Sequence, residues 1–584
     1  MGPGAAVRRR TVVASSLLPL LTLAGCERAR DASAGRQHIE GGFVGTDMAR
    51  GHALRDSTAW PAPARVHRNR VLIAGGGVAG LAAARALRLR GIDDFALLEL
   101  EDSAGGNSRG GSTGGIACPL GAHYLPVPGN AAADVQDLLV DLGLAQRGAG
   151  GWRLNARGET HLCHSPQERL FFNGEWQSGL LPVEGIGAAT LAQYQAFERV
   201  LTGVQQASAG AFTIPASKHP LAPIDIALDA ITFEVWLSQN GLVDAHLRWY
   251  LDYCCRDDYG AGIDSVSAWA GIHYFASRHG FHAPQAGADE AAAGPSGLAG
   301  GHEAGVLTWP EGNGWLVDRL ATPLGSRLRT GCTVVRISER RQGVEIDAFN
   351  AGTQQMERWQ VDRCIVALPL FIAARVLETP PAALRAAAAR LRYAPWLVAN
   401  LQLDAPLLDR PGAPPAWDNV IYPDAAPKPA DPASPTTRAN RTMADASTAA
   451  GRSAGGLGYV DARHQSLSQL PGPTVLTYYR SFGLDPAGRA ALYGQPWSHW
   501  RDAALADLSL PHPDLADKTR RIDIVRYGHA MAVPEPGVRS DPALAALQQT
   551  GRRQRLHFAH SDLSGYSVFE EAFSHGHRAG MAVG

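Results

Sequence analysis

Residues 71–109 read VLIAGGGVAGLAAARALRLRGIDDFALLELEDSAGGNSR, and this stretch predicts the fold of the protein. Its first three residues form an apolar run that suits a buried parallel strand. Gly75, Gly77 and Gly80 follow in G-x-G-x-x-G spacing. In a dinucleotide-binding βαβ unit such glycines allow a tight turn, the approach of a pyrophosphate, and close packing of the helix on the strand. We expect a helix that begins at Gly80, whose free N–H groups, with the backbone around Ala79, face the phosphates.

A second apolar strand, FALLEL, ends with Glu99, nineteen residues beyond Gly80. An acid at about this distance binds the ribose hydroxyls in such units. Strand, helix, second strand and acid in this order predict a dinucleotide site. The alternative is a Rossmann-like unit that has lost its ligand.

The residues after this acid indicate which dinucleotide is bound. Gly105, Gly106 and Arg109 resemble the glycine-glycine-arginine turn of the flavin-containing amine oxidase superfamily, which includes monoamine and polyamine oxidases, protoporphyrinogen oxidase and phytoene desaturases. The resemblance implies FAD as cofactor. Asn107 stands where an arginine commonly follows the glycine pair, so Arg109 is expected to reach the pyrophosphate instead. Residues 119–124, PLGAHY, resemble the family strand that passes close to the flavin ring.

Two later segments extend the resemblance. TWPEGNGWLVDRLA at 308–321 resembles a glycine-rich family segment, and Gly331, Val334 and Ile337 fit a pattern in which the backbone of Val334 holds the adenine. RLHFAHSDLSGYSVFEEAFSHGHRAG, residues 555–580, resembles the last FAD-binding strand and helix. There Asp562 is expected near the ribityl chain, and Glu571 at the helix under the pyrimidine end of the flavin. His560, Asp562 and Glu571 each depart from the usual residue, which marks a divergent branch.

The first 26 residues are predicted to be an export signal. Arg8, Arg9 and Arg10 precede a charge-free segment too short to span a membrane, which needs about 20 apolar residues. The arginine cluster resembles a twin-arginine signal, which exports folded proteins and so suits a flavoprotein loaded in the cytoplasm. Leu23 to Cys26 resemble a lipoprotein processing site, so Cys26 is expected to carry a lipid anchor and the protein to reside in the periplasm.

Composition bounds the remaining possibilities. A hydrophobic content of 45% and a net charge of −1 describe an ordinary globular protein without the basic surplus of nucleic-acid binders. The seven cysteines show no metal-ligand spacing, so we expect no metal. The predicted fold is α/β, a Rossmann-type FAD-binding domain interleaved with an α+β substrate-binding domain. The predicted divisions are a signal (1–26), a linker (27–66), FAD-binding parts (67–165, 306–395, 531–584) and substrate-domain parts (166–305, mainly helical, and 396–530, with a disordered insertion at 423–456).

FAD implies that a substrate C–H bond loses a hydride to flavin N5. The resemblance favours an amine or polyamine as the small-molecule substrate; the alternatives are a desaturase or porphyrinogen-type dehydrogenase acting on C–C bonds, and a non-catalytic flavin-binding protein. Many relatives place a lysine near N5 for the reaction with oxygen, but this sequence has none between Lys218 and Lys428, and Val398 or Asn400 takes its place. His123 and His529 are the candidate catalytic residues that could replace its charge. We expect slow reoxidation by oxygen and a preference for another electron acceptor.

Overall fold

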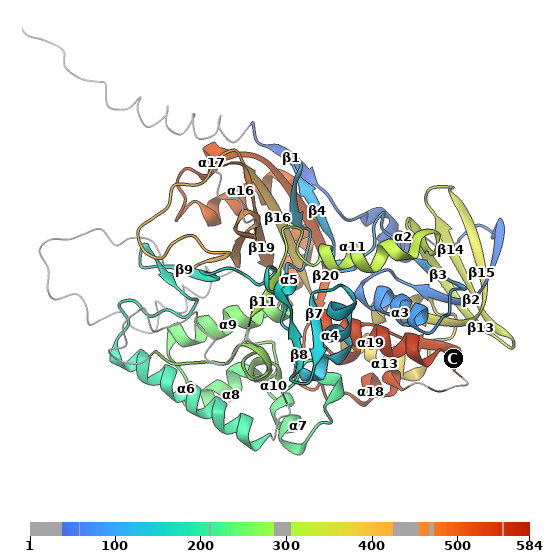
Figure 1. Ribbon diagram of the computed structural model, residues 1–584, viewed down its shortest axis with the longest axis horizontal. Helices are drawn as coiled ribbons and strands as arrows, with labels where there is room; N and C mark the ends of the chain where they lie inside the picture. The colour runs from blue at the N-terminus through green and yellow to red at the C-terminus, as the bar shows by residue number, and fades with distance from the viewer. Residues whose placement is uncertain are drawn as a thin grey trace, which may run out of the picture.

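The computed structural model describes residues 38–57, 59–208, 212–284, 305–423, 455–465, 472–549, 551 and 554–583. The predicted signal with Cys26 lies outside the described residues, as does nearly all of the insertion predicted at 423–456. The described chain forms two lobes, each with its own β-sheet and helices (Figure 1). The mixed α/β fold predicted from the sequence is therefore confirmed.

The first lobe contains the predicted βαβ unit. Its sheet has the order β12-β3-β2-β15-β14-β13, with β21 also paired to β15. Strands β3, β2, β15 and β21 are parallel, whereas β13, β14 and β15 form an antiparallel meander. The strands are β2 (Arg65–Ala74), β3 (Phe95–Leu98), β12 (Leu328–Arg329), β13 (Cys332–Arg340), β14 (Gly343–Asn350), β15 (Gln355–Val366) and β21 (Leu556–Phe558).

Helices α3 (Val78–Leu89) and α19 (Phe569–Ala582) pack side by side in this lobe. Small residues allow the contact, because a Cβ at Gly576 would lie 2.0 Å from the carbonyl oxygen of Ala79. Helix α3 begins at Val78, two residues before the predicted start at Gly80. The other helices of the lobe are α4 (Ala133–Asp141), α11 (Gly314–Ala321), α12 (Leu370–Val376), α13 (Ala382–Arg390) and α18 (Pro542–Gln548).

The second lobe is built on a sheet of order β1-β20-β16-β19-β18-β17-β9-β10. The segments LVANLQL, TVLTYYRSF and DIVRYGHA lie in β16, β19 and β20. Their inner residues are almost fully buried. The strands are β1 (Glu40–Phe43), β9 (Glu168–Phe172), β10 (Glu175–Ser178), β16 (Tyr393–Leu403), β17 (Asp418–Ile421), β18 (Gly458–Asp461), β19 (Thr474–Ser481) and β20 (Thr519–Ala532).

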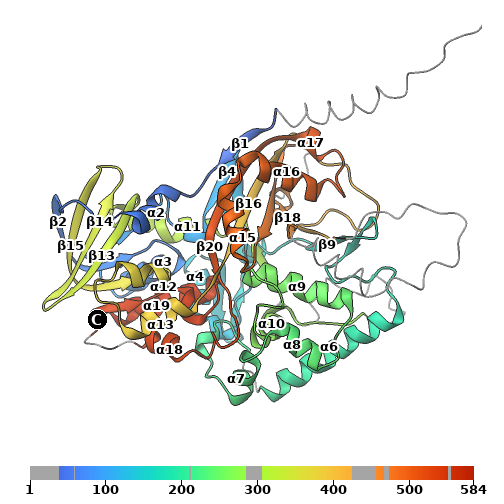
Figure 2. The same cartoon turned by 180° about the vertical axis from the view of Figure 1, so that it is seen from behind.

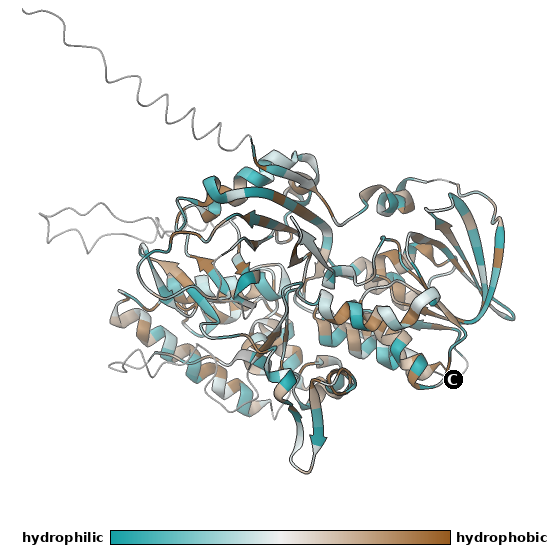
Figure 3. Cartoon of the chain, turned by 45° about the horizontal axis from the view of Figure 1, so that its top comes forward, coloured by the Kyte–Doolittle hydropathy of each residue, from teal (hydrophilic) through white to brown (hydrophobic). Residues whose placement is uncertain are grey.

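Helices cover both sides of this sheet (Figure 2). The expected helical region between 188 and 260 contains α6 (Ala188–Ala207), α7 (Pro223–Asp229), α8 (Phe233–Gln239) and α9 (Ala245–Tyr259). Residues 224–241 contain most of α7 and all of α8, which are separate helices. Further helices are α10 (Ala268–Tyr274), a π-helical turn (Phe275–His279), α15 (Pro486–Gly494), α16 (Trp497–Leu508) and α17 (Leu515–Lys518). In Figure 3 these helices carry hydrophobic and hydrophilic residues side by side, as expected of helices that cover a core.

Smaller elements join the lobes. Strand β6 (Tyr124–Pro126) pairs with β11 (Val306–Thr308), so two segments far apart in sequence lie side by side. The remaining hairpins and short helices are β4 (Gly110–Thr113), β5 (Ile116–Pro119), β7 (Ala145–Gly148), β8 (Gly151–Leu154) and α5 (Ala156–Glu159). Within the described part of the chain, no helix is both long and apolar enough to cross a membrane.

The prediction of a plain linker over residues 27–66 is wrong for its described part. Residues 40–43 form β1, which pairs in parallel with β20, and α2 (Met48–Asp56) follows against the first lobe. The segment escaped prediction because β1 is largely exposed and α2 has no buried residue, so neither shows apolar periodicity. Strand β2 also begins before residue 67, at Arg65.

Candidate active site

A cavity of about 480 Å³ lies between the two lobes. The glycine turns after β2 and β3 line one part of it, and residues of β16, β19 and β20 line another. Its volume is within the range of about 300–1,000 Å³ that is usual for small-molecule and cofactor sites.

The first glycine turn has the geometry that the motif predicts. Gly75 has φ +102°, a conformation that L-residues rarely adopt. A Cβ at Gly80 would lie 1.9 Å from the carbonyl oxygen of Gly75, so only glycine allows α3 to start this close to β2. Gly77 is the N-cap of α3, and a Cβ there would meet nothing within 4 Å. The space beside Gly77, at the N-terminus of a helix, is therefore free to receive a phosphate group.

Glu99 lies where the second strand ends, at the wall of the cavity. Its carboxylate accepts hydrogen bonds from the backbone N–H groups of Gly76 (2.8 Å) and Glu101 (2.9 Å). Burial raises the pKa of Glu99, and these two hydrogen bonds partly oppose the rise. The acid is thus fixed against the glycine turn, where the motif predicts a contact with ribose.

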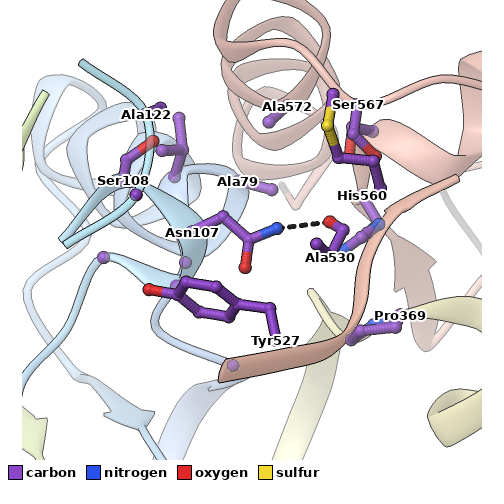
Figure 4. Close-up of a pocket in the computed structure, with 18 of the residues that line it drawn as sticks. Ala79, Asn107, Ser108, Ala122, Pro369, Tyr527, Ala530, His560, Ser567 and Ala572 are labelled. Carbon is purple, nitrogen blue, oxygen red and sulfur yellow. Dashed lines mark hydrogen bonds between the residues drawn. The ribbon is translucent and has the colours of Figure 1, made fainter. Parts of the chain in front are cut away.

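The second glycine turn connects the two lobes. Gly105 and Gly106 have φ +122° and +56°, and the cavity is lined by Gly106 and Asn107. The side-chain amide of Asn107 donates a hydrogen bond to the carbonyl oxygen of Ala530 in β20 (Figure 4). Arg109 does not line the cavity: it is buried, and its Nε donates to the carbonyl oxygen of Gly106 at 3.1 Å. Arg109 therefore supports the turn from behind, and the predicted contact of its side chain with the pyrophosphate does not fit this position.

Residues of β13 and of the loop before α11 also line the cavity. Val334 and Thr333 line it, and the register of β13 against β14 shifts directly after Val334. Such a bulge leaves a residue outside the ladder of backbone hydrogen bonds. The structure places Val334 where its predicted contact with adenine is possible. Asn313 lines the cavity as well, and its Nδ2 donates to the carbonyl oxygen of Tyr124 at 2.9 Å.

Asp562 lies fully buried at the cavity wall. One carboxylate oxygen accepts hydrogen bonds from the hydroxyl of Tyr393 (2.6 Å) and the N–H of Leu370 (2.9 Å). The other oxygen has no hydrogen-bond partner, although His560 Nδ1 lies 3.0 Å from it. Burial raises the pKa of Asp562, but the opposite effect of His560, Tyr393 and the Leu370 amide is larger, so the pKa lies below its usual value. An ionised acid with a free acceptor suits a ligand hydroxyl.

Glu571 does not fulfil its predicted role. It is fully buried and does not line the cavity; its carboxylate accepts hydrogen bonds from Tyr566 (2.6 Å) and Ser564 (2.5 Å). It also binds the backbone N–H of Ala216, which attaches the 216–218 turn to α19. Its neighbours Glu570 and Ala572 line the cavity instead. The side chain of Glu571 thus holds the fold together and does not face the cofactor site.

Both candidate histidines line the cavity, but neither carries a positive charge at neutral pH. The ring of His123 packs on Tyr479 (4.7 Å) and Trp417 (5.3 Å), and burial lowers its pKa to about 3. His529 is exposed towards the cavity and packs on Phe371 at 4.7 Å. The protein around the ring shields His529 from water, and this desolvation and the charge of Arg489 lower its pKa to about 4. Val398 lines the cavity, whereas Asn400 is buried behind it, with its amide on Pro119.

The cavity is also lined by a group of charged side chains that could not be identified from the sequence. Asp257 and Asp258 come from the end of α9, Arg278 from the π-helical turn, and Glu570 from α19. Arg278 lies 3.3 Å from both Asp258 and Glu570 and its side chain is only 6% exposed. Burial opposes its charge, but the two carboxylates keep the pKa of Arg278 above its usual value. Three carboxylates and one arginine leave the lining with an excess of negative charge.

Asp257 is the carboxylate of this group that faces the cavity without a partner. No hydrogen bond or ion pair involves its side chain in the part of the chain that the structure describes. Burial and the neighbouring Asp258 raise the pKa of Asp257 to about 7. It can therefore gain or lose a proton near neutral pH. A run of acids at the end of an apolar helix, RDDYG, was the available sequence signal.

The residues present fit FAD. The open space beside Gly77, the fixed acid Glu99 and the free oxygen of Asp562 offer a phosphate site, a ribose acceptor and a further hydroxyl acceptor along one cavity. Among the described residues, no group of three or more His, Cys, Asp or Glu side chains is placed to hold a metal ion.

Comparison with known proteins agrees with this geometry. The family model for flavin containing amine oxidoreductase matches residues 78–583. A search of curated proteins finds no significant match. Similar solved structures include a putrescine oxidase with putrescine bound (17% identity, TM-score 0.58, 88% of this chain and 99% of that chain). Another is the cyclohexylamine oxidase of Brevibacterium oxydans IH-35A (16% identity, TM-score 0.57, 88% of this chain and 97% of that chain). A third is a fatty acid isomerase of P. acnes (15% identity, TM-score 0.54, 87% of this chain and 97% of that chain). At these identities the structures show a shared fold.

Proposed function

Since the chain belongs to the flavin-containing amine oxidoreductases and is an FAD-dependent oxidoreductase, we propose that its substrate is an amine that enters the cavity as a cation. The observation that supports this proposal is the excess of carboxylates beside the FAD-binding residues, with Asp257 unpaired. An unpaired carboxylate in a cavity of low dielectric attracts an ammonium group more strongly than it would in water.

Asp257 also suits the proton transfer that must precede oxidation. A protonated amine has no lone pair to assist the loss of a hydride from the adjacent carbon, so the ammonium must first lose a proton. A carboxylate with a pKa of about 7 is a suitable acceptor near neutral pH. When bound, FAD supplies the two-electron acceptor for the hydride. The amine becomes an iminium ion, which water converts to a carbonyl compound and ammonia, or a shorter amine where the substrate nitrogen carries a second carbon chain.

The charge pattern argues against the C–C alternatives with acidic substrates. A fatty acid or a porphyrin carries carboxylates and would need a free cation in the site. Arg278 is the arginine that lines the cavity, and it is already held between Asp258 and Glu570. Pairing it with a substrate carboxylate would leave one of these buried acids uncompensated, which is costly.

A solved structure of the same fold indicates which class of amine to test first. The putrescine oxidase with the same fold binds a diamine. We therefore propose a diamine or polyamine as the natural substrate.

The experiment is anaerobic bleaching of the bound flavin by a panel of putrescine, cyclohexylamine and a fatty acid. We expect putrescine to bleach fastest and the fatty acid not at all. In Asp257→Asn, loss of the charge pair should cost about 2 kcal/mol or more, which raises KM for the amine by about 30-fold. Asp264→Asn, the same change at an exposed acid outside the cavity, is the matched control. Faster bleaching by the fatty acid, or an unchanged KM in Asp257→Asn, would contradict the proposal.

We also propose that the protein is exported by the twin-arginine route and anchored by lipid at Cys26. The support is in the sequence alone: three consecutive arginines, a charge-free segment and the LAGC site. FAD is inserted during folding in the cytoplasm, and the twin-arginine route carries folded proteins, so the route and the cofactor are compatible.

A further inference from the structure

The segment from β1 to α2, residues 40–56, crosses from one lobe to the other, and we call it the N-terminal clasp. β1 extends the sheet of the second lobe by parallel pairing with β20. Its approach is close, because a Cβ at Gly41 would lie 1.9 Å from the carbonyl oxygen of Ile522. The chain then turns and α2 lies beside the β13–β14 meander of the first lobe (Figures 1 and 2).

Polar contacts hold α2 on the first lobe next to the end of β3. The N–H of Asp47 donates to the carboxylate of Glu101 (3.0 Å), and Arg50 binds Asp102 (2.7 Å). At the other end, Arg375 donates to the carbonyl oxygen of Leu54 at 2.5 Å. Such contacts satisfy backbone groups that every helix end leaves free. They hold α2 beside Glu101 and Asp102, which follow the predicted ribose acid Glu99 in the chain.

Leu54 of α2 is half-buried and packs on the apolar core of the first lobe. None of its residues is buried, and a helix of nine residues is unstable alone in water. Yet Gly51 and Leu54 line the same cavity as Glu99 and Val334. A Cβ at Gly51 would meet nothing within 4 Å. Part of the surface of α2 therefore borders the cavity.

We propose that the N-terminal clasp is a cofactor-retaining element that closes the adenosine end of the FAD site, with Gly51 and Leu54 as its contact residues. The adenosine end follows from the neighbours: Glu99 is the ribose acid of the motif and Val334 lies at the predicted adenine position. Because the clasp is attached to both lobes, bound FAD would tie the first lobe to the edge of the second. The inference rests on FAD binding and does not depend on which amine is oxidised.

The test measures the release of FAD from purified holoenzyme by the rise of flavin fluorescence after dilution. Gly51→Leu adds a side chain that points into the cavity, and we expect FAD to dissociate at least about tenfold faster. Ala49→Leu adds the same side chain to the exposed side of the same helix and should leave the rate unchanged. Equal rates in Gly51→Leu and Ala49→Leu would overturn the proposal.

Leu54→Ala and proteolysis give an independent readout. Removal of the apolar contact between Leu54 and the ligand should raise the dissociation constant of FAD about tenfold. Trypsin should cleave the FAD-free protein after Arg50 or Arg55 several times faster than the holoenzyme. If FAD does not slow this cleavage, or if Leu54→Ala lowers the melting temperature without changing FAD affinity, α2 is a structural element and not a clasp.

Discussion

Two glycines of one turn, three residues apart, should respond to substitution in opposite ways. Gly77 has φ −68°, and a Cβ there would meet no atom within 4 Å. Gly80 lies inside α3, and a Cβ there would lie 1.9 Å from the carbonyl oxygen of Gly75. We predict that Gly77→Val folds but fails to bind FAD, whereas Gly80→Ala is impaired in folding.

The magnitudes follow from these surroundings. Replacing a glycine N-cap by valine costs about 1 kcal/mol, which a large protein tolerates. A valine at Gly77 fills the space in which α3 offers its free N–H groups, and hydrogen bonds to a charged group are worth about 1.5–3 kcal/mol each. Loss of two such bonds weakens FAD binding by about 3–6 kcal/mol, or roughly 10²–10⁴-fold. At Gly80, the added Cβ would meet backbone that cannot rotate away. Overpacking should therefore lower the free energy of unfolding by about 1–3 kcal/mol or more.

The assay combines flavin absorbance per mole of purified protein with thermal unfolding of the FAD-free form. Gly77→Val should be colourless with an almost normal melting temperature. Gly80→Ala should melt at a clearly lower temperature or be insoluble, and any soluble fraction should still bind some flavin. A yellow Gly77→Val protein of normal flavin content would refute the assignment of the phosphate site to this turn.

Three further predictions follow. The pKa of Asp257 rises from 3.8 to about 7 in the folded protein, so its contribution to the free energy of unfolding is present below pH 4 and is lost as the pH rises through 7. Over this pH window, urea unfolding should therefore show a smaller loss of stability for FAD-free Asp257→Asn than for the parent protein. Since His123 and His529 are neutral and the charge of Arg278 is balanced, stopped-flow mixing of reduced enzyme with oxygen should show slow reoxidation, and a fast phase would contradict this reasoning. Changing Arg8, Arg9 and Arg10 to Lys should retain active enzyme in the cytoplasm, and Cys26→Ser should release it from membranes; cell fractionation tests both.

The parts of the site that could be predicted are those that depend on local backbone geometry. Gly75 and Gly80 are required by a positive φ and by a close approach within one short segment, so the sequence alone reveals them. Glu99 follows from the same βαβ unit at a fixed distance. The group of Asp257, Arg278 and Glu570 could not be predicted in this way, because α9, the π-helical turn and α19 meet only in the folded chain. The N-terminal clasp was missed because its position depends on polar contacts, which leave no hydrophobic pattern.

The C-terminal helix shows why a correct resemblance still misplaced one side chain. Alignment of the motif placed Glu571 at the flavin, but the helix presents Glu570 and Ala572 to the cavity. Successive residues in an α-helix point about 100° apart, so an error of one position turns the side chain away from the cavity, here into the protein core. The residue that the motif selected instead binds Tyr566 and Ser564. The residue one position earlier, Glu570, lines the cavity and pairs with Arg278.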